Sequence, residues 1–242
     1  MSKAFFVNIA LEKPETLLPI VKDIINLVPP VIFNSIIMTS SVTNPKKGFE
    51  DVLGGLFLMI AFTLVWTVIS EFALRGRDYW SIGLLFIIVI GFFLIAYRKF
   101  YTASKKIKGE TVTVSAEDKS KSKWFNIIFI VEGVAIFVVV NVLNNTGHGN
   151  YFISCFALIV GLHFFPLGKI MQRKAYYLMG GFISLGAILG IILTNKGFPA
   201  YEVTGMVGAW CALATSAYGI TLIRRGNQLL LNSSTQSYQP GG

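Results

Sequence analysis

Two side chains able to exchange a proton stand inside stretches that are otherwise apolar. Glu132 lies in the run FNIIFIVEGVAIF, and His163 lies in LIVGLHFFPLGKIM. A carboxylate in the middle of a membrane-spanning helix costs roughly 3 kcal/mol or more on insertion scales, so it must face the protein, be protonated or find a partner. An imidazole, which titrates near neutral pH, is the obvious partner. We therefore treat Glu132 and His163 as candidate proton- or ligand-binding residues.

The two residues are expected at similar depths. At 1.5 Å per helical residue, counted from the same membrane face, Glu132 lies at a depth of about 12 Å and His163 at about 8 Å. Pro166 follows one turn after His163, and because proline lacks an N–H it frees the carbonyl of Leu162 and favours a kink. The pattern predicts a helix kink at Pro166 and a polar pocket beside it.

Three roles are open for this pair. The two groups can hydrogen-bond only to fix the bundle, they can form a proton- or ion-linked site, or they can belong to a catalytic or ligand site. A lone carboxylate and imidazole do not predict a metal site, since zinc normally takes three or four protein ligands. The sequence contains no P-loop, GxSxG, HExxH, CxxC or dinucleotide fingerprint, so no cofactor is expected.

Composition gives the class of protein that must position these residues. Hydrophobic residues make up 54% of the 242 positions and charged residues only 14%, against roughly 25% charged in soluble domains. A membrane helix needs roughly 20 apolar residues, and continuous apolar runs exclude the alternating strands of a barrel. The fold class is therefore all-α, a polytopic membrane bundle with six transmembrane helices. The expected spans are 52–74, 80–98, 124–143, 151–168, 175–195 and 202–223.

The basic residues indicate the orientation of the chain in the membrane. Of its 21 Lys and Arg residues, only Arg75, Arg77 and Lys196 fall on one side of the six-span map. Because cytoplasmic loops retain basic residues, both termini are expected in the cytoplasm, with the chain in the cell inner (plasma) membrane. The net charge of +9 thus reflects the orientation of the chain in the membrane. The expected partner is the lipid bilayer, and nucleic acid is not expected.

Three regions follow from this map. Residues 1–50 form an N-terminal cytoplasmic segment with an amphipathic stripe broken by Pro29-Pro30, which favours an interfacial helix. A seventh span over 24–42 is the alternative. Residues 51–225 form the six-helix transmembrane domain, and residues 226–242 form a tail that is expected to be disordered.

Small residues spaced four apart predict close helix packing in the last two spans. Gly186 and Gly190 lie in the fifth span, as do Gly180 and Ser184, and the sixth contains Gly205 and Gly208 with alanines four residues on. Such pairs let helix backbones approach closely in lipid. Two interpretations are open: a seam within one chain, or a homo-oligomer formed through Gly186 and Gly190.

One stretch carries a resemblance. The run GLHFFPLGKIMQRKAYYLMGGFISLG, residues 161–186, resembles a signature of small uncharacterised bacterial multi-pass membrane proteins, in which a GLHF-x-PL motif ends one helix and a basic turn leads into the next. The general pattern extends over about 50–225. The resemblance implies a bacterial inner-membrane helical bundle and no particular activity.

The interpretation that follows is a small transporter or proton-linked permease. The alternative is a non-catalytic structural or regulatory membrane protein, followed by a membrane-embedded enzyme, which would need more convergent polar groups than the spans contain. A water-accessible path to Glu132 distinguishes the first reading from the second, in which packing seals that residue.

Overall fold

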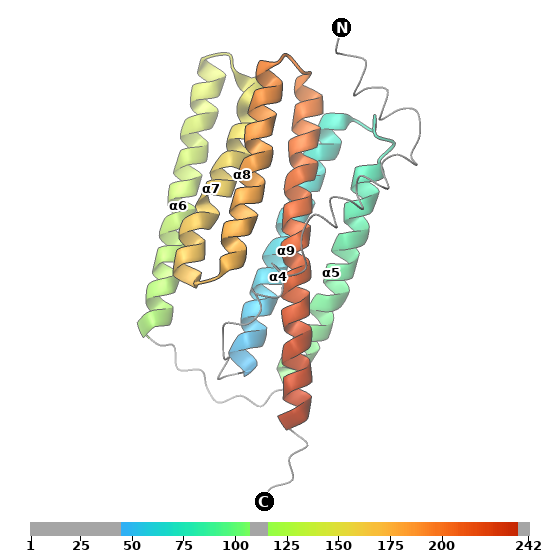
Figure 1. The fold of residues 1–242 in the computed structure, drawn as a ribbon, viewed down its shortest axis with the longest axis vertical. Coiled ribbons are helices and arrows are strands. Elements are labelled where there is room, and N and C mark those ends of the chain that lie inside the picture. The colour runs from blue at the N-terminus through green and yellow to red at the C-terminus, as the bar shows by residue number, and fades with distance from the viewer. Residues whose placement is uncertain (1–44, 107–115, 237–242) are drawn as a thin grey trace, which may run out of the picture. The chain divides into compact units, whose positions relative to one another are not determined.

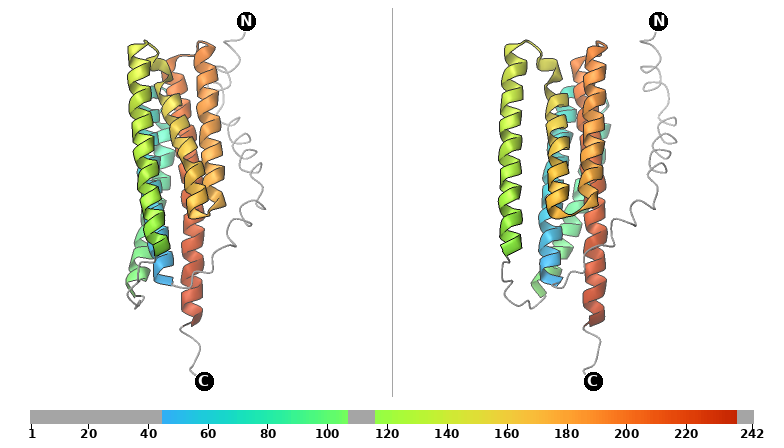
Figure 2. Two further views of the ribbon diagram at one scale, coloured as in Figure 1. Left: turned by 90° about the vertical axis from the view of Figure 1, so that its left-hand side faces the viewer. Right: turned by 60° about the vertical axis from the view of Figure 1, so that its left-hand side comes forward.

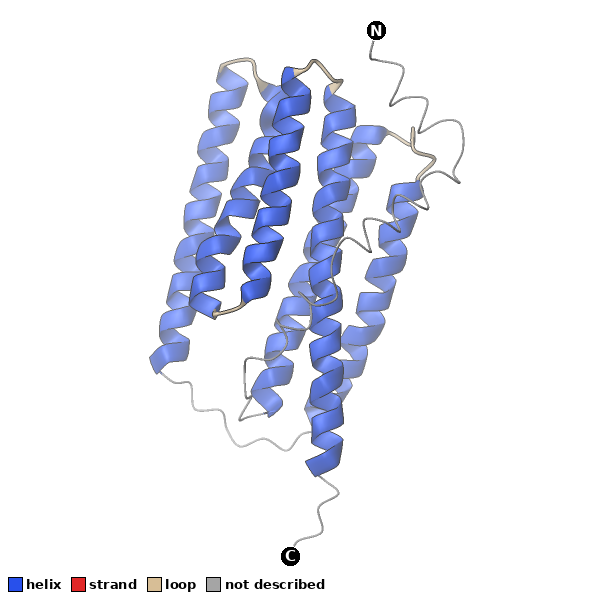
Figure 3. Cartoon of the chain, viewed as in Figure 1, coloured by secondary structure: helices blue, strands red, loops and turns tan. Residues whose placement is uncertain are grey.

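The structure, a computed structural model, describes residues 45–106 and 116–236, and the regular elements in these ranges are helices (Figure 1, Figure 3). Six of these helices are long and apolar enough to cross a membrane. The expected all-α, six-span bundle is therefore confirmed, and the chain is an integral, multi-pass membrane protein. In chain order the elements are α4 (Pro45–Leu74), α5 (Ser81–Lys106), α6 (Ala116–Asn145), the 3-10 helix η2 (Gly149–Tyr151), α7 (Phe152–Met171), α8 (Lys174–Asn195) and α9 (Ala200–Gln236).

Two helix bounds differ from the expected regions. α4 begins at Pro45, inside the segment assigned to the N-terminal region. α9 continues to Gln236, so the disordered tail does not begin at residue 226. Hydropathy marks only the part of a helix that lies in lipid, whereas polar residues can continue the same helix into water. The expected interfacial helix and the alternative span over 24–42 lie outside the described residues.

α4 and α9 run antiparallel and pack along most of their length, with α5 against both (Figure 1, Figure 2). Two buried hydrogen-bonding contacts join them: the hydroxyl oxygens of Thr63 and Thr215 are 2.8 Å apart, and the Ser70 hydroxyl donates to the Gly205 carbonyl over 2.8 Å. A Cβ at Gly208 would lie 3.0 Å from the Ser70 backbone nitrogen. Close backbone approach and such hydrogen bonds hold helices together in lipid, where the hydrophobic effect between them is absent.

α7 and α8 form the second tightly packed pair. A Cβ added at Gly180 would lie 2.7 Å from the carbonyl oxygen of Gly161, and one added at Gly161 would lie 2.8 Å from the backbone nitrogen of Ser184. Neither backbone atom can move aside as a flexible side chain would. The two helices therefore touch backbone to backbone. This contact fixes the rotation of α7 about its axis, and so decides which of its residues point away from α8.

Gly186 and Gly190 lie in the seam between α8 and its neighbours in the same chain. A Cβ at Gly186 would meet the Trp210 ring of α9, and one at Gly190 would lie 2.5 Å from the Ser154 hydroxyl of α7 and 2.6 Å from Val207 of α9. Both glycines are buried. The close packing expected of Gly186 and Gly190 is therefore found within one chain.

α6 lies at the outside of the bundle (Figure 2). Its helix contacts are almost entirely with α7, and very little of its apolar stretch is buried, whereas more than half of that of α9 is. Among the described helices, α6 therefore packs mainly on α7. Its contact with α7 contains Glu132 and His163.

Candidate functional site

Glu132 of α6 and His163 of α7 meet in the structure. The Oε1 atom of Glu132 lies 3.1 Å from Nδ1 of His163. Their side chains are 10% and 5% exposed, respectively. The expectation that two neighbouring helices bring these residues to one place at similar depth agrees with this geometry. The role of the pair stays a proposal.

The imidazole is held by aromatic rings, and its contact with the carboxylate is mainly electrostatic. The ring centroid of His163 lies 5.7 Å from that of Phe129 on α6 and 4.1 Å from that of Phe164 on α7. Nδ1 of His163 lies close to Glu132, but the geometry of this contact is not that of a hydrogen bond, and Nδ1 has no hydrogen-bond partner. The pair attracts fully when His163 is protonated and Glu132 is ionised.

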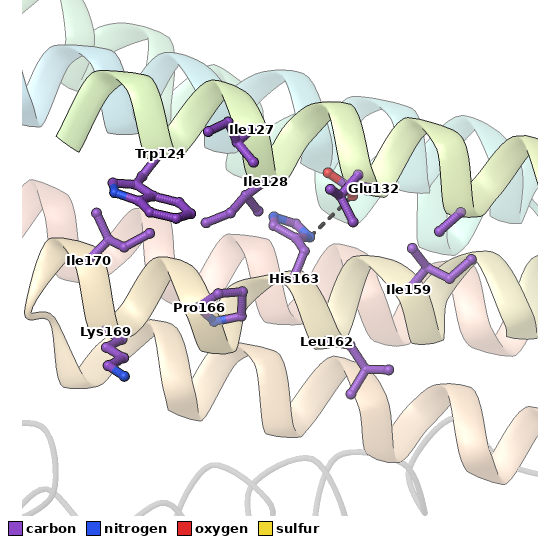
Figure 4. Close-up of a pocket in the computed structure, with 12 residues that line it drawn as sticks. Trp124, Ile127, Ile128, Glu132, Ile159, Leu162, His163, Pro166, Lys169 and Ile170 are labelled. Atoms are coloured by element: carbon purple, nitrogen blue, oxygen red, sulfur yellow. Dashed lines mark ion pairs between the residues drawn. The ribbon is translucent and has the colours of Figure 1, made fainter. Parts of the chain in front are cut away.

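A groove between α6 and α7 runs past the pair. It has a volume of about 780 Å³ and is lined by one stripe from each helix, with residues at helical spacings of three and four (Figure 4). Apart from Glu132, His163 and Lys169, its lining is apolar or aromatic. α6 contributes Trp124, Ile127, Ile128, Val131, Glu132 and Ala135, and α7 contributes Ile159, Leu162, His163, Pro166, Lys169 and Ile170.

The groove reaches one end of the bundle and is open along its side. Its lining includes Trp124 near the start of α6 and Lys169 near the end of α7, both of which are exposed, as are Val131 and Leu162. We call this end of the bundle the basic end, because most of the described basic residues lie in the helix segments that meet there. They are Lys46, Lys47, Arg98, Lys99, Lys105, Lys106, Lys119, Lys121, Lys123, Lys169, Arg173, Lys174, Arg224 and Arg225. The groove therefore extends from Glu132 and His163 to the basic end of the bundle.

Pro166 lies inside α7 and lines the groove (Figure 4). The helix is assigned without interruption from Phe152 to Met171, so Pro166 does not end it. On the opposite side, α8 approaches Gly161 and Gly168 closely. A Cβ added at Gly161 would meet the Ser184 backbone, and one added at Gly168 would lie 2.8 Å from the Tyr177 ring. These contacts turn the His163 and Pro166 stripe toward α6.

Two other charged groups are engaged in structural contacts. Glu71, near the end of α4, accepts a hydrogen bond from the backbone N–H of Gly83 and so caps the first turn of α5. Arg173, in the turn between α7 and α8, lies 2.9 Å from the Asp51 carboxylate of α4. Among the described residues no group of three or more His, Cys, Asp or Glu side chains is placed to hold a metal ion.

Comparison with known families gives one match. Residues 122–220 match a family of unknown function, DUF7010. The matched region is less than half of the chain, and it contains Glu132, His163 and all the other residues that line the groove. The match agrees with the expected resemblance to an uncharacterised family, and it brings no activity with it. No curated protein and no solved structure shows a significant match.

Proposed function

We propose that the chain is a small proton-linked transporter, in which Glu132 and His163 bind and release the proton and the groove between α6 and α7 receives the solute. One observation carries the proposal: the pair lines a groove that continues to Trp124 and Lys169 at the basic end. A pair that served only to hold α6 against α7 would be best sealed by packing, because open space forfeits contacts.

The chemistry of the pair suits a single proton. One carboxylate and one imidazole, with their nearest atoms 3.1 Å apart, can hold a proton on either group. Adding or removing one proton changes the charge of the pair by one, and this change alters its attraction for a charged solute in a medium of low dielectric constant. Titratable groups inside membrane helices commonly serve proton relays and transport paths.

The second candidate is a structural or regulatory membrane protein. It is favoured by the low exposure of the two side chains, 10% and 5%, since a nearly buried pair can join two helices without exchanging a proton. The two candidates differ in whether the pair responds to the pH of the surrounding water.

Infrared spectroscopy of the protein in bilayers tests this difference directly. We expect carboxyl and imidazole bands to change reversibly as the pH of the overlying buffer is stepped through the range in which these groups titrate. The carboxyl change should be lost in Glu132→Gln and the imidazole change in His163→Gln. Bands that do not respond to pH would establish the structural candidate instead.

Matched variants separate the pair from the other titratable groups. His148 is the only other histidine in the sequence and follows α6 in the turn before η2. Glu202 accepts a hydrogen bond from the Tyr201 hydroxyl and does not line the groove. His148→Gln and Glu202→Gln should therefore leave the bands assigned to the pair unchanged.

We also propose that the basic end faces the cytoplasm of the cell in whose plasma membrane the chain lies. Reporter fusions in the 105–123 segment and at the C-terminus should score cytoplasmic, and a fusion in the 144–150 turn should score external, because basic residues are retained on the cytoplasmic side. An external location of the first two fusions would contradict the proposed orientation.

A further inference from the structure

We propose that the groove between α6 and α7 binds a lipophilic cation, which takes the place of the His163 proton beside Glu132. The inference rests on the proposed function and names the substrate class of that site. It follows from three properties of the groove: its apolar lining, its opening along the side of the bundle, and the sign of the charge at its buried centre.

The lining excludes strongly polar solutes. A sugar or an amino acid buried there would leave most of its polar groups without partners, because the polar side chains that line the groove are Glu132, His163 and Lys169. The other lining residues are apolar or aromatic, and the volume of about 780 Å³ lies in the usual range of small-molecule sites. The occupant is therefore largely apolar and carries few polar groups.

The charges select a cation. The Glu132 carboxylate is the anionic group of the lining, and its side chain is 10% exposed. Lys169 carries the opposite charge, but it is exposed and lies six helical residues from His163, about 9 Å along the axis. Coulomb energy falls with both distance and dielectric constant. The attraction of a cation to Glu132 at about 4 Å, in a medium of dielectric constant about 20, is therefore roughly ninefold larger than its repulsion from Lys169 at about 9 Å in water.

Aromatic rings add to the preference for a cation. Trp124 lines the groove near its basic end, whereas Phe129 lies behind the lining, with its ring centroid 5.7 Å from that of His163. Ring faces attract cations, tryptophan most strongly. A cation with aromatic or alkyl groups would thus contact rings and aliphatic side chains while its charge faces Glu132.

The exchange conserves charge. In the proposed exchange the empty site holds one proton, carried on His163 beside Glu132, whose Oε1 atom lies 3.1 Å from Nδ1. When one cation binds, one proton leaves Nδ1 of His163 for water, and the net charge of the site is unchanged. The bound cation supplies the positive charge beside Glu132, so the carboxylate no longer needs the proton on His163 to balance its charge. The ionisable groups that lie toward the pair from the packed helices are Glu132 itself, Lys169 of α7, Tyr176 of α8 beside Phe164, and Tyr218 of α9 beside Tyr176.

Two probes of the same shape and opposite charge test the inference. Tetraphenylphosphonium and tetraphenylborate binding are measured on the full chain in nanodiscs, each against empty nanodiscs, since both ions partition into lipid. We expect the wild-type protein to bind the phosphonium and not the borate. Equal binding of both ions would show an unselective apolar groove, and stronger binding of the borate would show that Lys169 sets the preference; either result overturns the inference.

Proton release is the second readout. Calorimetry in two buffers of different ionisation enthalpy should give one proton released per phosphonium bound. While His163 is protonated in the empty site, the affinity should then rise about tenfold per pH unit, by linkage. Binding without proton release by the wild-type protein would overturn the exchange.

Variants assign the two roles. Glu132→Gln should lower phosphonium affinity by about tenfold or more, whereas Glu132→Asp, which keeps the carboxylate, and Glu202→Gln, outside the groove, should retain it. His163→Gln should still bind the phosphonium, without proton release and without dependence on pH. If the infrared bands respond to pH but the phosphonium does not bind, only the substrate class is wrong. If the bands do not respond, the proposed function fails whatever the groove binds.

Discussion

Gly180→Leu is expected to destabilise the bundle by about 3 kcal/mol, at the upper end of the usual cost of overpacking. A Cβ at this position would lie 2.7 Å from the Gly161 carbonyl oxygen and 3.0 Å from the Phe164 Cβ. Because the nearest atom belongs to a backbone, α7 and α8 must separate to admit the side chain. The free energy of unfolding in mixed micelles, titrated with a denaturing detergent and followed by circular dichroism, measures the loss.

The neighbouring glycine provides the control. Gly181 is exposed, and a Cβ there would meet nothing within 4 Å. Gly181→Leu should therefore change stability by no more than about 0.5 kcal/mol, although it makes the same chemical change one residue away. Equal destabilisation by both variants would mean that the α7–α8 contact is not the close approach described above.

Removing either member of the buried pair is expected to cost about 1–3 kcal/mol, because the remaining polar group loses its partner. Glu132→Gln and His163→Gln should each destabilise the protein, and the double variant should cost less than the sum of the two. Coupling energies within membrane helices average about 0.6 and reach about 1.7 kcal/mol. A double-mutant cycle in the same detergent titration gives the coupling energy of the pair.

Asn141 supplies a matched comparison on the same helix. Its side-chain amide donates to the carbonyl of Phe137 in α6, and it lies nine residues after Glu132, about 14 Å along the helix axis. Asn141→Val combined with His163→Gln should be additive. Additivity of the Glu132 and His163 changes as well would show that the two side chains do not interact energetically in the folded protein.

Much of the fold can be predicted from the sequence because membrane insertion is a local property. Whether a run of about 20 residues lies in lipid depends on its own composition, so the six spans and the all-α class follow directly from the hydropathy. The depth of a residue is equally local, since each residue advances a helix by 1.5 Å. Glu132 and His163 could therefore be placed at similar depths before their helices were placed in space.

The ends of the helices were less predictable for the same reason. Hydropathy ends where the lipid ends, whereas a helix ends where its backbone hydrogen bonding ends. α4 thus begins at Pro45 and α9 continues to Gln236, in polar stretches that the hydropathy assigns to flanking regions.

Only the tertiary structure decided which faces meet. Small residues at Gly180, Gly186 and Gly190 predict close contact, but each could face a neighbouring helix or another copy of the chain, and local spacing does not distinguish these partners. In the folded chain Gly180 meets Gly161 of α7, and Gly186 meets Trp210 of α9. The backbone contact between Gly180 and Gly161 sets the rotation of α7 about its axis, which turns His163 toward α6 and leaves the groove beside Glu132. Rotation about the axis depends on partners distant in the sequence, whereas depth depends only on the helix itself.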